Sequence, residues 1–200
     1  MSVLHELPPS SARNPFHGKG LRIPVALLLD PARRWTVREL AADTGVSLAL
    51  ASGVVRRLRE EGALPDDVVQ GRRATIQATA PLLEATAARW PAPSLYVWGG
   101  TVPREGVPLG GGPALSTAGF LEQDRPRAYV RSRGEVLDLL ALWGGSEGSR
   151  AAADWEITML DIDLPIGVLP PQIAALELGA DPRGQEMLHE RAQALLTIAR

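Results

Sequence analysis

The pattern of apolar and polar positions between residues 34 and 64 predicts two short helices joined by a tight turn. In the first helix, which should end near Thr44, the apolar residues share one face: Val37, Leu40 and Ala41. In the second helix the apolar residues recur at i, i+3, i+4 and i+7: Ala51, Val54, Val55 and Leu58. Both helices are therefore expected to pack one side against a common core.

Polar residues and a glycine mark the ends of these two helices. Thr36 and Glu39 form a capping box, in which the threonine side chain bonds the backbone three residues on and the glutamate reaches back. Gly45 suits the left-handed position after a helix, and Ser47 is a favourable N-cap for the next one. A capped helix, a glycine turn and a second helix are typical of a helix-turn-helix, whose second helix reads DNA.

The polar face of the second helix carries small residues followed by arginines: Ala49, Ser52, Gly53, Arg56, Arg57 and Arg59. Small side chains let a helix approach a groove closely, and arginines can then meet phosphates. An ordinary amphipathic helix with solvated arginines is the alternative. The caps, the turn and the segment that follows favour nucleic-acid binding.

The flanking segments predict a winged helix-turn-helix domain over residues 18–90. Residues 19–30 predict a first helix, and residues 81–90 a closing helix before Pro91. Strand candidates at 68–69 and 74–76 indicate a hairpin, so that Arg72 and Arg73 would lie on the wing, near phosphates or a minor groove. A basic surface turn is the alternative for this pair. Residues 1–17, interrupted by prolines, predict a flexible arm.

Residues 91–200 predict a small α/β domain with a regulatory or assembly role. Strands are expected at 95–98, 128–130 and 155–164, and helices at 114–121, 135–143, 172–178 and 185–199. The glycine- and proline-rich stretch 99–113 predicts a loop. The fold class expected for the whole chain is therefore α+β.

Composition adds a modest charge asymmetry. Residues 1–90 carry a net charge of +3 and residues 91–200 one of −5, which fits a DNA-binding domain joined to one that does not bind DNA. The chain has no cysteine, no apolar run near the roughly 18 residues of a membrane helix, and no signal-peptide core in its first twenty residues. A cytoplasmic location is expected, with no cofactor, no metal and no membrane partner.

One constellation suggests a different chemistry. Gly148 and Ser149 are followed by Asp161 and Asp163, which resembles the Gly-Ser turn and D-x-D pair of the nucleotidyltransferase superfamily. Two carboxylates at i and i+2 on a strand face one side and can share magnesium ions. However, Gly148 follows a helix instead of a strand, and no third carboxylate on a later strand stands out. Surface carboxylates are the alternative, and no catalytic residue is assigned.

The stretch from Arg34 to Leu64 resembles the helix-turn-helix of bacterial winged-helix regulators, including the IclR and AbiEi-type antitoxin groups. The segment 164–196 resembles the end of AbiEi-like proteins, and 114–121 would match an earlier helix of such domains. The matching residues of the distal segment are Val168, Pro170, Pro171, Gln172, Leu176, Glu177, Leu178, Gly184 and Ala192. The chain departs from the family at Gly53, where a longer polar side chain is usual, and in the loop 99–113.

The resemblance implies a transcriptional regulator that binds double-stranded DNA, and more narrowly an autorepressing type IV antitoxin. It also implies a second domain related in fold to nucleotidyltransferases, and a genetic pairing with a nucleotidyltransferase toxin. A homodimer is a further expectation. The alternatives are a magnesium-dependent nucleotidyltransferase and a winged-helix protein-docking module. The DNA-binding residues expected are Thr36, Ser47, Ala49, Ser52, Arg56, Arg57, Arg59, Arg72 and Arg73.

Overall fold

The computed structural model describes residues 14–66, 75–103, 105–120 and 125–198. They form two compact units, each described by itself below. The helical unit consists of residues 14–90 together with 175–198, and the sheet unit consists of residues 91–174. The chain is thus mixed in secondary structure, as the expected α+β class requires. No helix among the described residues combines the length and apolarity needed to cross a membrane.

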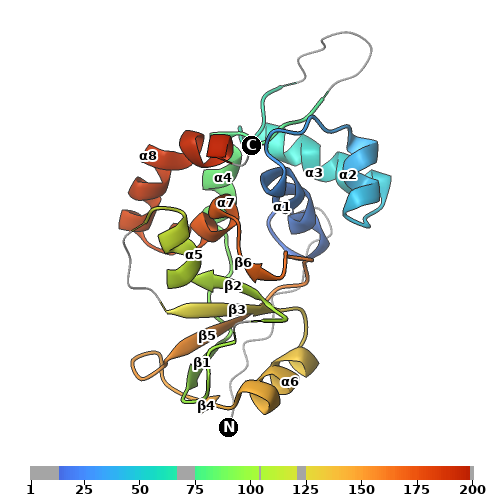
Figure 1. Cartoon of the computed structure of the whole chain (residues 1–200). Helices are drawn as coiled ribbons and strands as arrows, with labels where there is room; N and C mark the ends of the chain where they lie inside the picture. Colours follow the sequence, from blue (N-terminus) through green and yellow to red (C-terminus); the bar gives the residue numbers. More distant parts are fainter. Residues whose placement is uncertain (1–13, 67–74, 104, 121–124, 199–200) are drawn as a thin grey trace. The chain divides into compact units, whose positions relative to one another are not determined.

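Three helices form the first part of the helical unit (Figure 1): α1 (Arg22–Leu29), α2 (Val37–Asp43) and α3 (Leu48–Glu60), preceded by the 3-10 turn η1 (Gly18–Leu21). Their buried faces meet in one core, which includes Ile23, Leu27, Leu28, Leu40, Val54, Val55 and Leu58. The expected start of α2 after Thr36, its end near Thr44 and the start of α3 after Ser47 agree with the observed bounds. The buried positions of both helices follow the expected apolar stripe.

A short backbone bridge closes this three-helix group. Trp35, between α1 and α2, pairs antiparallel with Ile76. Each residue donates its N–H to the other's carbonyl at 2.7 Å. Both side chains are buried. The segment after α3 is thereby tied to the segment before α2. The hairpin expected over 68–76 falls largely on residues 67–74, which lie outside the described residues.

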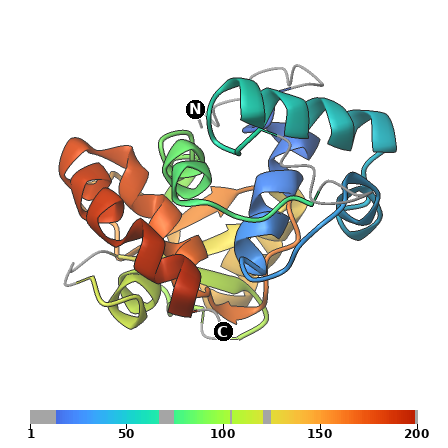
Figure 2. The same ribbon diagram turned by 90° about the horizontal axis from the view of Figure 1, so that it is seen from above.

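The second part of the helical unit consists of α4 (Ala80–Ala87), the 3-10 segment η2 (Ala175–Ala180) and α8 (Pro182–Ile198). Both η2 and α8 pack against α4, and Figure 2 shows the red α8 beside the green α4. The apolar face of α4, with Leu82, Leu83 and Ala87, is covered in this way. Gly179 is needed there, because a Cβ at this position would lie 2.0 Å from the Ala87 carbonyl oxygen.

This grouping differs from the division expected from the sequence, which placed all of 91–200 in one domain. The pattern of η2 and α8 showed that they are amphipathic but not which surface covers their apolar side. Leu188, Ala192 and Leu195 are all buried, and their helix packs against α4, about a hundred residues earlier in the chain. Local periodicity carries no information about such distant partners.

The sheet unit contains a six-stranded mixed sheet in the order β4-β1-β5-β3-β2-β6, which can be followed in Figure 1. The strands are β1 (Leu95–Trp98), β2 (Pro108–Gly111), β3 (Pro126–Val130), β4 (Ser146–Glu147), β5 (Trp155–Met159) and β6 (Gly167–Val168). The central strands β3 and β5 are parallel, and β1 is antiparallel to β5. Three helices accompany the sheet: α5 (Gly112–Thr117), α6 (Arg133–Trp143) and α7 (Pro171–Ala174).

Alternate residues of the central strands form the apolar core of this unit with α6. Val97, Val130, Trp155 and Ile157 pack with Val136 and Leu139 of the helix. The opposite face of the sheet is polar at its centre, where Arg127 of β3 pairs in register with Glu156 of β5. The Arg127 Nη2 atom lies 2.8 Å from Glu156 Oε2, with side chains 11% and 9% exposed. This cross-strand ion pair is therefore buried.

The stretch 99–113 is only in part the loop expected from its composition. Residues 108–111 form β2, which lies between β3 and β6. Proline is tolerated because Pro108 is the first residue of the strand. Gly111 is required at its end, where φ is +70° and a Cβ would lie 1.8 Å from the Arg125 carbonyl oxygen. Glycine here permits a close backbone approach instead of marking a loop.

Candidate nucleic-acid interface

Hydrogen bonds fix the start of α2, the turn that follows it and the start of α3. Thr36 accepts a bond from the Glu39 N–H, while Glu39 Oε2 accepts from the Thr36 N–H at 2.7 Å, which completes the expected capping box. After α2, Gly45 has φ +64° and the Val46 N–H bonds the Ala41 carbonyl at 3.1 Å. This six-to-one bond is a Schellman motif. Ser47 then accepts from the Leu50 N–H, as the N-cap of α3.

The orientation of α3 is fixed further by contacts with the rest of the helical unit. The Arg22 guanidinium of α1 donates to the Thr44 carbonyl in the turn at 3.4 Å. A second Schellman motif ends α3, where Gly62 has φ +72° and the Ala63 N–H bonds the Leu58 carbonyl at 2.8 Å. Thr79 donates to the Ala63 carbonyl at 2.6 Å and caps α4. The helix is thus held at its start and at its end.

The small residues that were predicted to lie on the polar face of α3 are found on its exposed face. Ser47, Ala49 and Ser52 are exposed, and Gly53 is partly exposed on the same side. Arg56, one turn further, has 71% of its side chain exposed. The helix therefore presents mainly small side chains in its first half, beside a half-exposed Leu48, and an exposed guanidinium in its second half.

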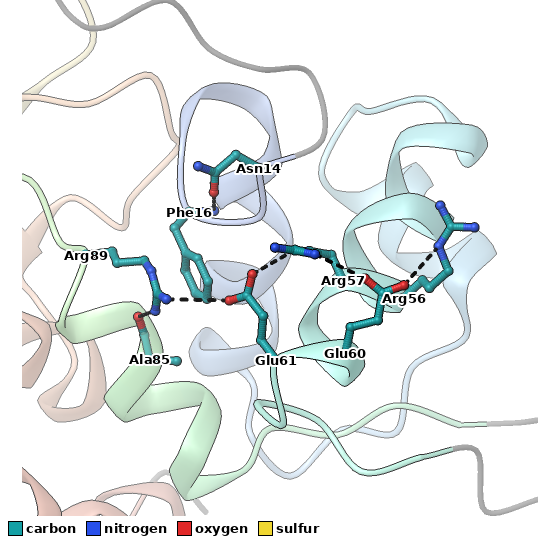
Figure 3. Close-up of polar contacts among 8 residues, drawn as sticks. All are labelled: Asn14, Phe16, Arg56, Arg57, Glu60, Glu61, Ala85 and Arg89. Carbon is teal, nitrogen blue, oxygen red and sulfur yellow. Dashed lines mark hydrogen bonds and ion pairs between the residues drawn. The ribbon is translucent and has the colours of Figure 1, made fainter.

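Arginines and glutamates alternate in a row of ion pairs that runs from the second half of α3 to Arg89 (Figure 3). Arg56 lies 3.8 Å from Glu60, and Arg57 lies 3.4 Å from Glu60 and 2.8 Å from Glu61. Glu61 is also 3.6 Å from Arg89, which follows α4. The row thus contains three arginines and two carboxylates. The net positive charge of the row is lower than expected from the arginines of the second helix alone, because two carboxylates lie between the guanidinium groups.

The remaining expected contact residues differ in their surroundings. The Thr36 hydroxyl donates to Glu39 at 2.7 Å, so it serves the helix cap, and any phosphate contact there would have to share it. Arg59 is only partly exposed, on the flank of α3. Arg72 and Arg73, the expected wing residues, lie outside the described residues.

The structure adds basic residues that were not among the expected contacts. Arg33 stacks over the Trp35 ring at 3.6 Å, and Arg34 and Arg38 are exposed near the start of α2. Their position beside the capping box was visible in the sequence. The placement of Arg89 beside the end of α3 was not, since it depends on how α4 packs.

The four residues of the nucleotidyltransferase hypothesis are not brought to one place. Gly148 follows β4 and donates to the Tyr96 carbonyl, and Tyr96 pairs with Glu156, near the start of β5. Asp161 and Asp163 follow the other end of β5. Asp163 lies 3.1 Å from Arg131. Within the described residues, no cluster of three or more His, Asp or Glu side chains could hold a metal ion.

Arg131 instead joins two carboxylates at the end of β3. It contacts Glu135 at 3.2 Å as well as Asp163. The pKa of the Arg131 guanidinium is raised, mainly by the charge and hydrogen bond of Glu135 and to a smaller extent by those of Asp163. The D-x-D pattern thus supplies one partner of a surface ion pair.

No family model, no curated protein and no solved structure matches this chain.

Proposed function

We propose that this protein binds double-stranded DNA through the exposed face of α3 and regulates transcription. The observation that carries the proposal is the surface of α3, on which Ala49 and Ser52 lie exposed ahead of Arg56 and Arg57. Neither small residue is needed to fill the core. A rigidly capped helix with such a face can enter a major groove and place its guanidinium groups against the backbone.

The arrangement around α3 supports a winged helix-turn-helix. Three helices share one core, the turn between α2 and α3 is short, and the segment before α2 pairs with the segment after α3 at Trp35 and Ile76. In winged helices such pairing forms the base of the wing. Arg72 and Arg73 precede Ile76 in the sequence, and the proposal keeps them as phosphate contacts in addition to those of α3.

The mode of recognition follows from the side chains available. Ala49 and Gly53 cannot make bidentate hydrogen bonds to base edges, so only Ser47, Ser52 and Arg56 could read bases directly. The larger part of the binding energy would come from arginines on phosphates, with the shape of the groove contributing to specificity. We therefore expect strong salt dependence and modest sequence discrimination.

The test is the affinity of the full chain for duplex DNA from its own upstream region, measured by fluorescence anisotropy over a salt series. Replacing Arg56, Arg72 and Arg73 together with alanine should weaken binding and flatten the plot of log K against log salt. Each lost phosphate contact should reduce the slope by about 0.9. Replacing the exposed Arg183 of α8 with alanine is the control.

Binding by the triple variant equal to that of the wild type would show that the site is elsewhere. Failure of the wild-type chain to retain DNA even at low salt would instead favour a protein-docking module. The narrower proposal, an autorepressing antitoxin that acts as a homodimer, is supported only by the family resemblance. A nucleotidyltransferase toxin encoded beside this chain is the observation that would strengthen it most.

A further inference from the structure

We infer that the cleft between the start of the helical unit and the second half of α3 receives a backbone phosphate of DNA, and that Glu60 and Glu61 occupy the place of that phosphate in the free protein. The inference depends on the proposed function and deepens it. It assigns Arg89 as a phosphate contact and the two glutamates as an internal competitor of DNA.

The cleft lies within the helical unit and has a volume of about 410 Å³. Gly53, Arg56 and Arg57 form one side, and Asn14, Phe16 and Arg89 form the other. Glu60 and Glu61 also line it. Figure 3 shows the charged side chains of the cleft in one row from Arg56 to Arg89. The cleft therefore adjoins the face of α3 that the proposed function directs to DNA.

Arg89 is held in place by three groups. Its guanidinium carbon lies 4.5 Å from the centre of the Phe16 ring, its Nη1 donates to the Ala85 carbonyl at 3.1 Å, and its Nη2 lies 3.6 Å from Glu61. The first two contacts persist if Glu61 turns away. An oriented guanidinium then remains, which suits a phosphate because its donors are already directed.

Gly53 indicates that something approaches the helix closely at this point. Glycine within a helix is unfavourable, and no packing contact requires it here, since a Cβ at Gly53 would meet no atom within 4 Å. Its backbone does not have positive φ either. Without a side chain at Gly53, a phosphate or sugar of DNA could approach the helix backbone beside the three arginines.

The charges of the row favour an exchange of anions. The Glu60 carboxylate makes exposed ion pairs, with 51% of its side chain exposed, whereas Glu61 is partly buried, with 24% exposed. Exposed pairs contribute little and are screened by salt. A phosphodiester, whose single negative charge is shared by two oxygens, can replace a carboxylate on the same guanidinium groups. DNA would thus have to displace Glu61 from Arg57 and Arg89. This competition lowers the affinity of the protein for DNA.

The test is a double-mutant cycle on the full chain, using Glu61→Gln, Arg89→Gln and the combination. The DNA probe is the same duplex at several salt concentrations. Glu61→Gln should bind about threefold more tightly than the wild type, because it removes the carboxylate charge that competes for Arg57 and Arg89. Arg89→Gln should bind more weakly, with a slope shallower by about 0.9. In the Arg89→Gln background the gain from Glu61→Gln should shrink.

Glu190→Gln on α8 is the matched control, because it removes the same charge from an exposed residue outside the cleft. An equal gain in this control, or an equal gain with and without Arg89, would assign the effect to net charge and overturn the inference. Unchanged DNA affinity in Glu61→Gln would also overturn the inference. The proposed function would still stand in that case, provided that the wild type binds DNA. No binding by the wild type at low salt would remove both.

Discussion

Single residues of α3 carry most of the argument, and Gly53 is the clearest of them. Gly45 and Gly62 have positive φ and end their helices, so their identity follows from the backbone. Gly53 has neither positive φ nor a close neighbour. Its presence in the middle of a 13-residue helix therefore lowers helix stability without helping the fold.

Gly53→Ala should consequently separate stability from function. It should raise the free energy of unfolding by about 0.5–1 kcal/mol, because alanine loses less backbone entropy in a helix. The same change should weaken DNA binding, since the added methyl group lies in the cleft. Urea unfolding and anisotropy titration measure the two effects.

Gly45→Ala is the control of opposite sign. At φ +64° an L side chain is strained, so the change should destabilise the helical unit by about 1 kcal/mol. A Gly53→Ala variant that is stabilised and binds DNA as the wild type does would show that nothing approaches α3 at this position.

At the scale of elements, the helices are fixed by local signals, whereas the sheet depends on pairing. The Thr36 and Ser47 caps and the Gly45 turn could all be read from the sequence, because each acts within about one and a half helical turns. The strand at 95–98 was also predicted with its observed bounds. The strand β2 was not, since its proline and two glycines are tolerated only through its neighbours β3 and β6.

The buried pair of Arg127 and Glu156 links the two parallel strands at the centre of the sheet. Arg127→Met should destabilise the protein by about 3 kcal/mol, because it leaves the Glu156 carboxylate buried without its partner. Adding Glu156→Leu should restore most of that loss, since two apolar side chains can replace a buried ion pair. Thermal and urea unfolding of both variants check this. If the double variant is less stable than Arg127→Met, the glutamate has another essential partner.

At the scale of the whole molecule, the sequence indicated where the helices are better than how they group. The terminal helix α8 joins the N-terminal helices because the apolar face of α4 needs cover, and that choice of partner is not encoded in local periodicity. The candidate site divides in the same way. Arg56 and Ser52 followed from helical spacing, whereas Arg89 and the carboxylates between the arginines emerged only from packing.

The central claim is that the exposed face of α3 lies against DNA, and the absence of cysteine from the chain allows a direct measurement. Ser52→Cys, labelled with a photoactivatable cross-linker, should become covalently attached to duplex DNA on illumination. Gln193→Cys, at an exposed position of α8, carries the same label as the control. The proposal predicts cross-linking at residue 52 well above that at residue 193. Equal or absent cross-linking from residue 52, under conditions where DNA is bound, would contradict it.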